Sequence, residues 1–217
     1  MKRLLVSTAL EGSWGEAEPV LFLGEWCRLY SRRHCWSALD AEVLPYHWDE
    51  HEKLVKDREF LGLLYEEILI EISDKLNKVH DTDHNVRYWR ILLGPWLGYF
   101  VQILFDRWSS VNQAINNHEI SETIVLTGFE DARVPNDAED FLYLGNSHSW
   151  NHYLFSRILT ELTDITCVNR SAIGVEHGIH YGVSTEIIRS PETVNLKTSL
   201  VAAYSSLSKR FVRPTDC

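Results

Sequence analysis

The chain has 217 residues, of which 45% are hydrophobic, and its formal net charge is -10. A chain of this length can bury a full core without disulfides, and its acidic balance disfavours nucleic-acid binding, since phosphate contacts need an excess of Lys and Arg. It contains no run of about 18 apolar residues, so it predicts no transmembrane segment. The four cysteines have no CxxC spacing, which predicts free thiols in a cytoplasmic protein.

The first part of the chain predicts short strands separated by loops. Three short apolar runs, rich in β-prone residues, occur at Arg3–Thr8, Val20–Leu23 and Ala41–Pro45. Glycines and a proline separate the first two runs and predict a loop. Strands separated by loops or helices fit an α/β layer better than a hairpin.

Two long helices are predicted next. Apolar residues recur at three- and four-residue steps from Asp49 to Val79. A second helix is expected to begin near Asp83, as its N-cap, and to run towards Ile115, with a bend at Gly94–Pro95. Apolar residues on nearly all sides between Ile91 and Phe105 predict that this helix lies deep in the domain, at its centre.

Strands and helices continue to alternate in the second half. The pattern predicts a strand at Ser121–Thr127, a turn at Val134–Asp137 before a short helix to Leu144, a helix at Ser149–Leu162 and a strand at Ile165–Val168. No strong period follows Asn169. We therefore expect an N-terminal α/β domain over residues 1–168 and an irregular or partial C-terminal segment over residues 169–217.

Two candidate sites follow the first two strands, where open α/β sheets bind ligands. Glu11 lies in the first loop and could act as a general base or contact a sugar hydroxyl, or be an exposed turn carboxylate. Glu25, Trp26 and Arg28 follow the second strand and could bind a polar acceptor or form a charge pair beside an aromatic ring. The first loop has neither GxGxxG nor Walker spacing, so it predicts no nucleotide phosphate site.

His47 and Trp48 follow the third strand. With Asp49 and His51, His47 could bind a divalent metal, or these groups could be surface and capping residues. We expect the second of these, and hence no metal site.

Arg87, Arg90 and Arg107 lie on the second long helix. A buried guanidinium needs a partner, so these arginines are candidates for substrate binding or for structural ion pairs with Asp83 or Asp106.

Histidine pairs at His148 and His152, and at His177 and His180, have no HExxH glutamate. The sequence also has no serine elbow and no Cys/His nucleophile signature. A chance pairing of histidines therefore explains them better than a metal hydrolase.

Several long strings of sequence carry a resemblance. They are Leu4–Glu11, Pro19–Tyr30, Val43–Asp49, Arg87–Leu97 and Val134–Asp137. These strings resemble the amino-terminal part of a transferase family found among bacterial O-antigen and other surface-polysaccharide biosynthesis genes, over about residues 3–160.

The resemblance implies the first half of a two-domain, GT-B-like glycosyltransferase with a Rossmann-like sheet. Such a half presents a carbohydrate acceptor, whereas the nucleotide-sugar donor binds mainly a second domain. We therefore expect no cofactor in this chain, a nucleotide-activated donor for the full-length protein, and an incomplete enzyme. No nucleic-acid partner is expected, and attachment at the inner membrane surface is compatible with the absence of a spanning segment.

The expected roles are those of positioning and electrostatics. Arg87 and Arg90 would steady anionic groups, a glutamate (Glu11 or Glu25) would contact hydroxyls, and a tryptophan (Trp26 or Trp48) would stack on a sugar ring. The alternative is a non-catalytic interaction module or an inactive truncated product.

Overall fold

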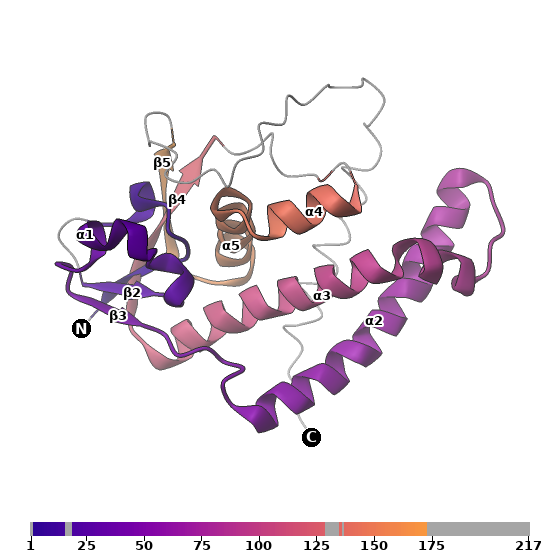
Figure 1. Ribbon diagram of the computed structural model, residues 1–217, viewed down its shortest axis with the longest axis horizontal. Coiled ribbons are helices and arrows are strands. Elements are labelled where there is room, and N and C mark those ends of the chain that lie inside the picture. The colour runs from indigo at the N-terminus through magenta and orange to yellow at the C-terminus, as the bar shows by residue number, and fades with distance from the viewer. Residues whose placement is uncertain (1, 16–18, 129–134, 136, 173–217) are drawn as a thin grey trace. The chain divides into compact units, whose positions relative to one another are not determined.

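The computed structural model describes residues 2–15, 19–128, 135 and 137–172. By their contacts, the residues form two compact units (Figure 1): unit 1 comprises Met1–Leu44 and Ser110–Cys217, and unit 2 comprises Pro45–Ser109. The expected boundary after residue 168 stays a prediction, since residues 173–217 lie outside the described residues.

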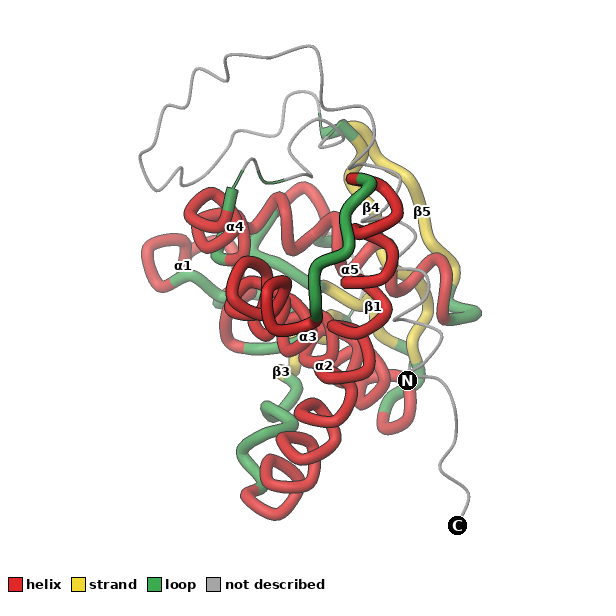
Figure 2. Tube along the Cα trace, turned by 90° about the vertical axis from the view of Figure 1, so that its right-hand side faces the viewer, coloured by secondary structure: helices red, strands yellow, loops and turns green. Residues whose placement is uncertain are grey.

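Unit 1 contains a five-stranded sheet in which every neighbouring pair is parallel. Figure 2 shows β4 and β5 running side by side along it. The order is β3-β2-β1-β4-β5. The strands are β1 (Arg3–Val6), β2 (Val20–Phe22), β3 (Ala41–Val43), β4 (Ile120–Thr127) and β5 (Thr166–Ser171). The predicted α/β class is confirmed, and the sheet is Rossmann-like.

The strand order reverses between β1 and β4. The chain builds outward from β1 to β2 and β3, and then returns to place β4 on the other side of β1. The β1–β4 register shifts between Arg3 and Leu5. Ligands of open α/β sheets bind beyond the carboxyl ends of the strands at such a reversal.

The hydrophobic core of unit 1 is formed largely by apolar side chains of the strands. Side chains of successive strand residues alternate between the two faces, and Leu4, Val6 and Phe22 belong to one buried apolar cluster, which Trp14 joins from the loop after β1. Leu5 is also fully buried. Burial on both faces of the sheet explains why β2 and residues 4–6 of β1 are apolar, as parallel strands usually are.

The remaining helices of unit 1 follow the strands, and two of them are capped as their sequences suggest. Asp137 accepts a hydrogen bond from the Asp140 backbone nitrogen, and Ser147 accepts one from that of Trp150. The predicted helices over residues 137–144 and 149–162 are confirmed. The helical elements are η1 (Glu11–Ser13), η2 (Glu25–Cys27), η3 (Tyr30–Arg32), α1 (Arg33–Trp36), α4 (Ala138–Gly145) and α5 (His148–Leu162).

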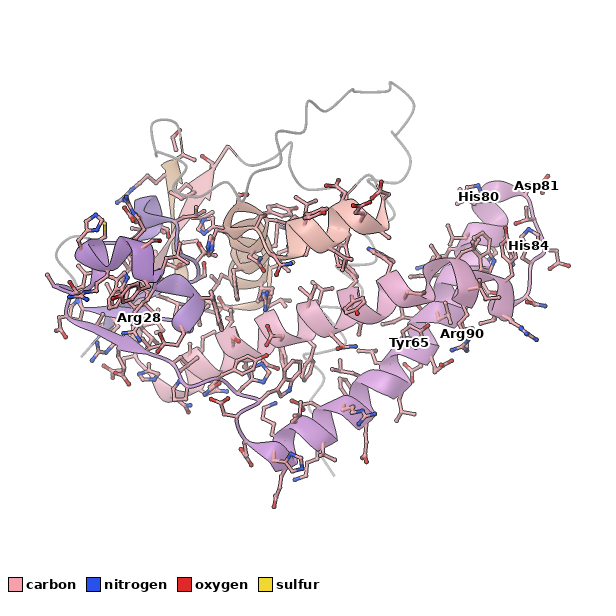
Figure 3. The ribbon with its side chains drawn as sticks, viewed as in Figure 1. Arg28, Tyr65, His80, Asp81, His84 and Arg90 are labelled. Atoms are coloured by element: carbon pink, nitrogen blue, oxygen red, sulfur yellow. The ribbon has the colours of Figure 1, made fainter. Side chains whose placement is uncertain are left out.

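Unit 2 contains α2 (His51–His80) and the part of α3 (Val86–Asn117) that ends at Ser109. Figure 3 labels His80, Asp81 and His84 in and beside the turn that joins the two helices.

Asn77 organises this turn. Its amide nitrogen donates to the His84 carbonyl at 2.8 Å, and its amide oxygen accepts from the Thr82 hydroxyl, the His84 backbone nitrogen and the Trp89 indole. One side chain therefore ties the end of α2 to the start of α3.

Two expectations for α3 are wrong. The helix begins after Asn85, whose side-chain oxygen accepts from the Tyr88 backbone nitrogen, so Asp83 is not the N-cap. Nor is α3 deeply buried on all sides, since Ile91 and Leu92 are 70% and 56% exposed. The physical reason is that the first turns of α3 contact α2 on one side only: Trp89 bonds to Asn77, Arg90 bonds to Glu66, and Gly94 lies against Tyr65. The helix is continuous through Pro95.

None of the described helices is long and apolar enough to cross a membrane.

Candidate functional site

His152 joins the ends of β1 and β4 in unit 1. Its Nε2 atom accepts from the Leu126 backbone nitrogen at 2.8 Å, and its Nδ1 atom lies 3.3 Å from the Thr8 hydroxyl. A backbone N–H can only donate, so Nε2 must carry the lone pair, and in a neutral ring Nδ1–H donates to Thr8. Burial lowers the pKa of His152 to about 4, which keeps the ring neutral at pH 7.

The role of His152 was missed by the sequence reasoning, which explained its spacing from His148 as chance. The available signal was its position among apolar residues of α5, such as Phe155, because a histidine on a buried face must find partners for both nitrogens.

Glu11 lies in η1, directly after the loop residues that follow β1. Both of its carboxylate oxygens accept from Arg32, at 2.5 and 2.6 Å. This hydrogen bonding lowers the pKa of the Glu11 carboxyl, although partial burial opposes the shift. The carboxylate is therefore ionised and already bonded, which suits contact with a hydroxyl better than proton abstraction.

The short helix η2, which follows β2, contains Glu25 and Trp26, and Arg28 comes directly after it. Glu25 and Arg28 form an ion pair in which the glutamate side chain is 75% exposed, and the guanidinium also lies over the Trp36 ring. The Trp26 indole donates to the Ser7 carbonyl at 3.0 Å. Its ring stacks near that of Phe155, with centroids 6.5 Å apart. Trp26 therefore contributes to the packing of unit 1.

In unit 2, a buried carboxylate gathers three side chains. The Tyr46 hydroxyl donates to Asp106 Oδ1 at 2.8 Å, and His47 Nε2 lies 3.0 Å from the same oxygen. Arg107 donates to Oδ2. The segment after β3 is therefore attached to α3 through one carboxyl group.

Asp106 is ionised in this arrangement. Burial alone would raise the pKa of its carboxyl group, but the hydrogen bonds from His47 and Tyr46 and the positive charge of Arg107 together lower it. Because the carboxylate can only accept, His47 Nε2 carries the proton of this hydrogen bond.

Trp48 lies beside this group. Its indole donates to Asp57 at 2.9 Å, and its ring centroid is 4.7 Å from that of His47 and 6.3 Å from that of Phe105. The polar edge of the indole is therefore held by α2, and its faces contact other rings.

Arg90 and Arg87 differ in their surroundings. Arg90 donates to both carboxylate oxygens of Glu66, and its guanidinium carbon lies 5.9 Å from the centre of the Tyr65 ring. Figure 3 labels Arg90 and Tyr65. Arg87 is exposed and has no ion pair among the described residues. Of these two arginines, Arg87 is the one whose charge is available to a ligand.

The structure thus brings His47, Trp48 and Arg107 together around Asp106, and it groups Glu25, Trp26 and Arg28 in unit 1. Sequence reasoning named Asp106 only as an ion-pair partner of an arginine and gave Tyr46 no role. Its expectation that His47 is a surface or capping group is wrong, because the imidazole is buried against the Asp106 carboxylate. Among the described residues, no group of three or more His, Cys, Asp or Glu side chains is placed to hold a metal ion.

The fold and these sites define an α/β protein. It has a Rossmann-like parallel sheet, and polar side chains follow the carboxyl ends of the first two strands. Residues 3–177 match the model of the LIC12162 family transferase, and the chain belongs to that family. No curated protein and no solved structure matches the chain.

Proposed function

We propose that the chain is the acceptor-side domain of a glycosyltransferase-like enzyme of surface-polysaccharide biosynthesis, such as that of O-antigen. It would transfer a sugar from a nucleotide-activated donor to a carbohydrate acceptor, with the donor bound mainly by a second, GT-B-like domain. The observation that carries the proposal is membership of a transferase family over residues 3–177, on a Rossmann-like sheet. The resemblance to surface-polysaccharide proteins supplies the substrate class.

The described side chains suggest a division of roles within this proposal. Arg87 is exposed and forms no ion pair among the described residues, so its charge can steady an anionic group of the donor or acceptor. Glu11 and Glu25 present carboxylate oxygens that can accept from sugar hydroxyls. Trp26 and Trp48 are both half-buried, and each has one neighbouring aromatic ring stacked near it, so a sugar ring would stack on the part of either indole that Phe155 or Phe105 does not cover.

The test is a transfer assay with a panel of nucleotide sugars and short carbohydrate acceptors. It is run on this chain and on the chain followed by a second domain. Release of the nucleotide that depends on the acceptor is expected only with the second domain present. Turnover by this chain alone would contradict the division between two domains, and no transfer by either form would contradict glycosyl transfer.

A matched pair of variants tests the role of Arg87. Arg87→Gln should raise KM for the anionic substrate about tenfold or more, because a charge-assisted hydrogen bond contributes roughly 1.5–3 kcal/mol. Arg58→Gln, which changes another exposed arginine of unit 2, serves as the control and should leave KM unchanged. Equal effects of the two substitutions would show that only net charge matters.

A further inference from the structure

His47 has one ring nitrogen that the described structure leaves unused. The imidazole is buried, with 2% of its side chain exposed. Its Nε2 atom is bonded to Asp106, but its Nδ1 atom is buried and has no hydrogen-bond partner. A buried polar atom without a partner is uncommon in native proteins and is found at sites of chemistry or of bound water.

The hydrogen bonds around Asp106 determine the state of this nitrogen. Since the ionised carboxylate accepts the Nε2 proton, a neutral ring must carry its lone pair on Nδ1. An imidazole that donates one N–H to a buried carboxylate and keeps a lone pair on the other nitrogen can act as a general base, because the carboxylate orients the ring and stabilises the imidazolium that forms.

Two aromatic rings flank the imidazole and decide how a substrate could reach it. The ring centroids of Tyr46 and Trp48 lie 4.9 and 4.7 Å from that of His47. Tyr46 is 37% exposed, and residues 44–50 form neither helix nor strand. Displacement of the Tyr46 ring would break one hydrogen bond to Asp106 and no element of secondary structure, while His47 and Arg107 would still hold the carboxylate.

We propose that His47 is a catalytic residue that accepts the proton of the acceptor substrate's hydroxyl group, and that Asp106 is its positioning residue. The acceptor oxygen would form a bond to the electrophilic atom of the transferred group as the donor's bond to its leaving group breaks. The bonding pair departs with the leaving group, and the hydroxyl proton moves to Nδ1. The imidazolium then returns that proton to the leaving group or to water.

This inference rests on membership of a transferase family and on the proposed hydroxyl acceptor, but not on the identity of the sugar. It adds a base in unit 2, whereas the sequence analysis offered Glu11 of unit 1 as a general base. Arg107 would contribute by holding Oδ2 of Asp106, so that Oδ1 faces His47.

Kinetics on the enzyme with its donor domain give the first test. His47→Gln can keep a hydrogen bond to Asp106 through its side-chain amide but has no Nδ1 base. It should lower kcat by about 10²- to 10⁴-fold with little change in KM or in Tm. His80→Gln, the same substitution at an exposed histidine at the end of α2, is the control and should retain kcat within a few-fold. Wild-type kcat in His47→Gln would overturn the proposal.

A spectroscopic test does not depend on turnover. In the chain labelled with ¹⁵N-histidine, the His47 ring should show a protonated Nε2 and an unprotonated Nδ1 without a hydrogen bond. Methyl glycosides of common hexoses, added as hydroxyl probes, should shift the Nδ1 resonance in the direction of hydrogen-bond acceptance. Asp106→Asn should move proton occupancy from Nε2 towards Nδ1, which distinguishes a positioning role from mere packing.

The two tests separate the failure of this inference from the failure of glycosyl transfer. Absence of transfer by the wild type counts against the proposed function, and the spectrum then decides the role of His47. If Nδ1 is already hydrogen-bonded without ligand, or does not respond to any methyl glycoside, a structural water explains the unused nitrogen and the proposal is wrong.

Discussion

The two units bury their apolar residues in different ways. In unit 1 the strands lie within a sheet, and both Leu4 and Leu5 are buried although they point to opposite faces. In unit 2 the first turns of α3 bury Leu97 but leave Leu92, five residues earlier, 56% exposed. The difference shows that an apolar run of similar composition is fully covered inside a parallel sheet and only half covered in a pair of helices.

The largest effect should come from the sheet. Phe22→Ala removes a fully buried ring from β2 and should lower the free energy of unfolding by about 3–5 kcal/mol. Urea unfolding followed by circular dichroism measures it. Val168→Ala, at a 38% exposed position of β5, is the control and should cost less than about 1 kcal/mol. Similar losses for both variants would contradict the burial assigned to β2.

The next effect is the dependence of stability on pH that His152 should produce in unit 1. Its pKa falls from 6.5 to about 4 through burial. A histidine whose pKa is lower in the folded state contributes stability above the unfolded pKa, and this is lost as the pH falls towards the folded pKa. The free energy of unfolding should therefore decrease by about 3 kcal/mol between about pH 7 and about pH 4.

His152→Gln provides the comparison for this pH effect. Glutamine can still accept from Leu126 but does not titrate, so the difference between wild type and variant isolates the histidine. Urea unfolding at several pH values should show the two stabilities converging as the pH falls. Parallel curves would mean that protonation of His152 does not break its bonds to β4 and Thr8.

Most of the fold could be predicted from sequence because periodicity records local burial. The apolar runs gave all five strands to within a few residues, and the three- and four-residue steps gave α2. The deep burial of α3 could not be predicted this way. The apolar side chains of Ile91, Leu92 and Tyr99 could all be buried if other elements packed against them. The sequence period does not show whether such elements are present.

The candidate site was less predictable, because its residues are distant in sequence. Glu25 and Arg28 were found as a local cluster, since they are three positions apart. The bond between His47 and Asp106 spans 59 positions. A buried carboxylate in an apolar helix indicates that a partner exists, but a single sequence does not identify which of ten histidines it is.

A smaller effect is expected at the turn of unit 2. Asn77→Ala removes four hydrogen bonds, three to the turn after α2 and one to Trp89 of α3, and should lower the free energy of unfolding by roughly 1–3 kcal/mol. Asn77→Asp keeps the three accepted bonds and loses the donated one, so its loss should be smaller. Thermal unfolding at neutral pH gives both values. An equal loss would indicate that the bond to the His84 carbonyl dominates.

The smallest effect tests the half-covered face of α3 directly. Leu92→Lys places a charge at an exposed position and should change the free energy of unfolding by less than about 0.5 kcal/mol, as most surface substitutions do. Leu97→Ala, on the covered face of the same helix, should cost about 2–5 kcal/mol. A loss above about 1 kcal/mol for Leu92→Lys in urea unfolding would mean that another part of the protein, or a second copy, covers this face in solution. Both units would then bury their apolar residues on every side, and they would differ only in which segment or molecule buries them.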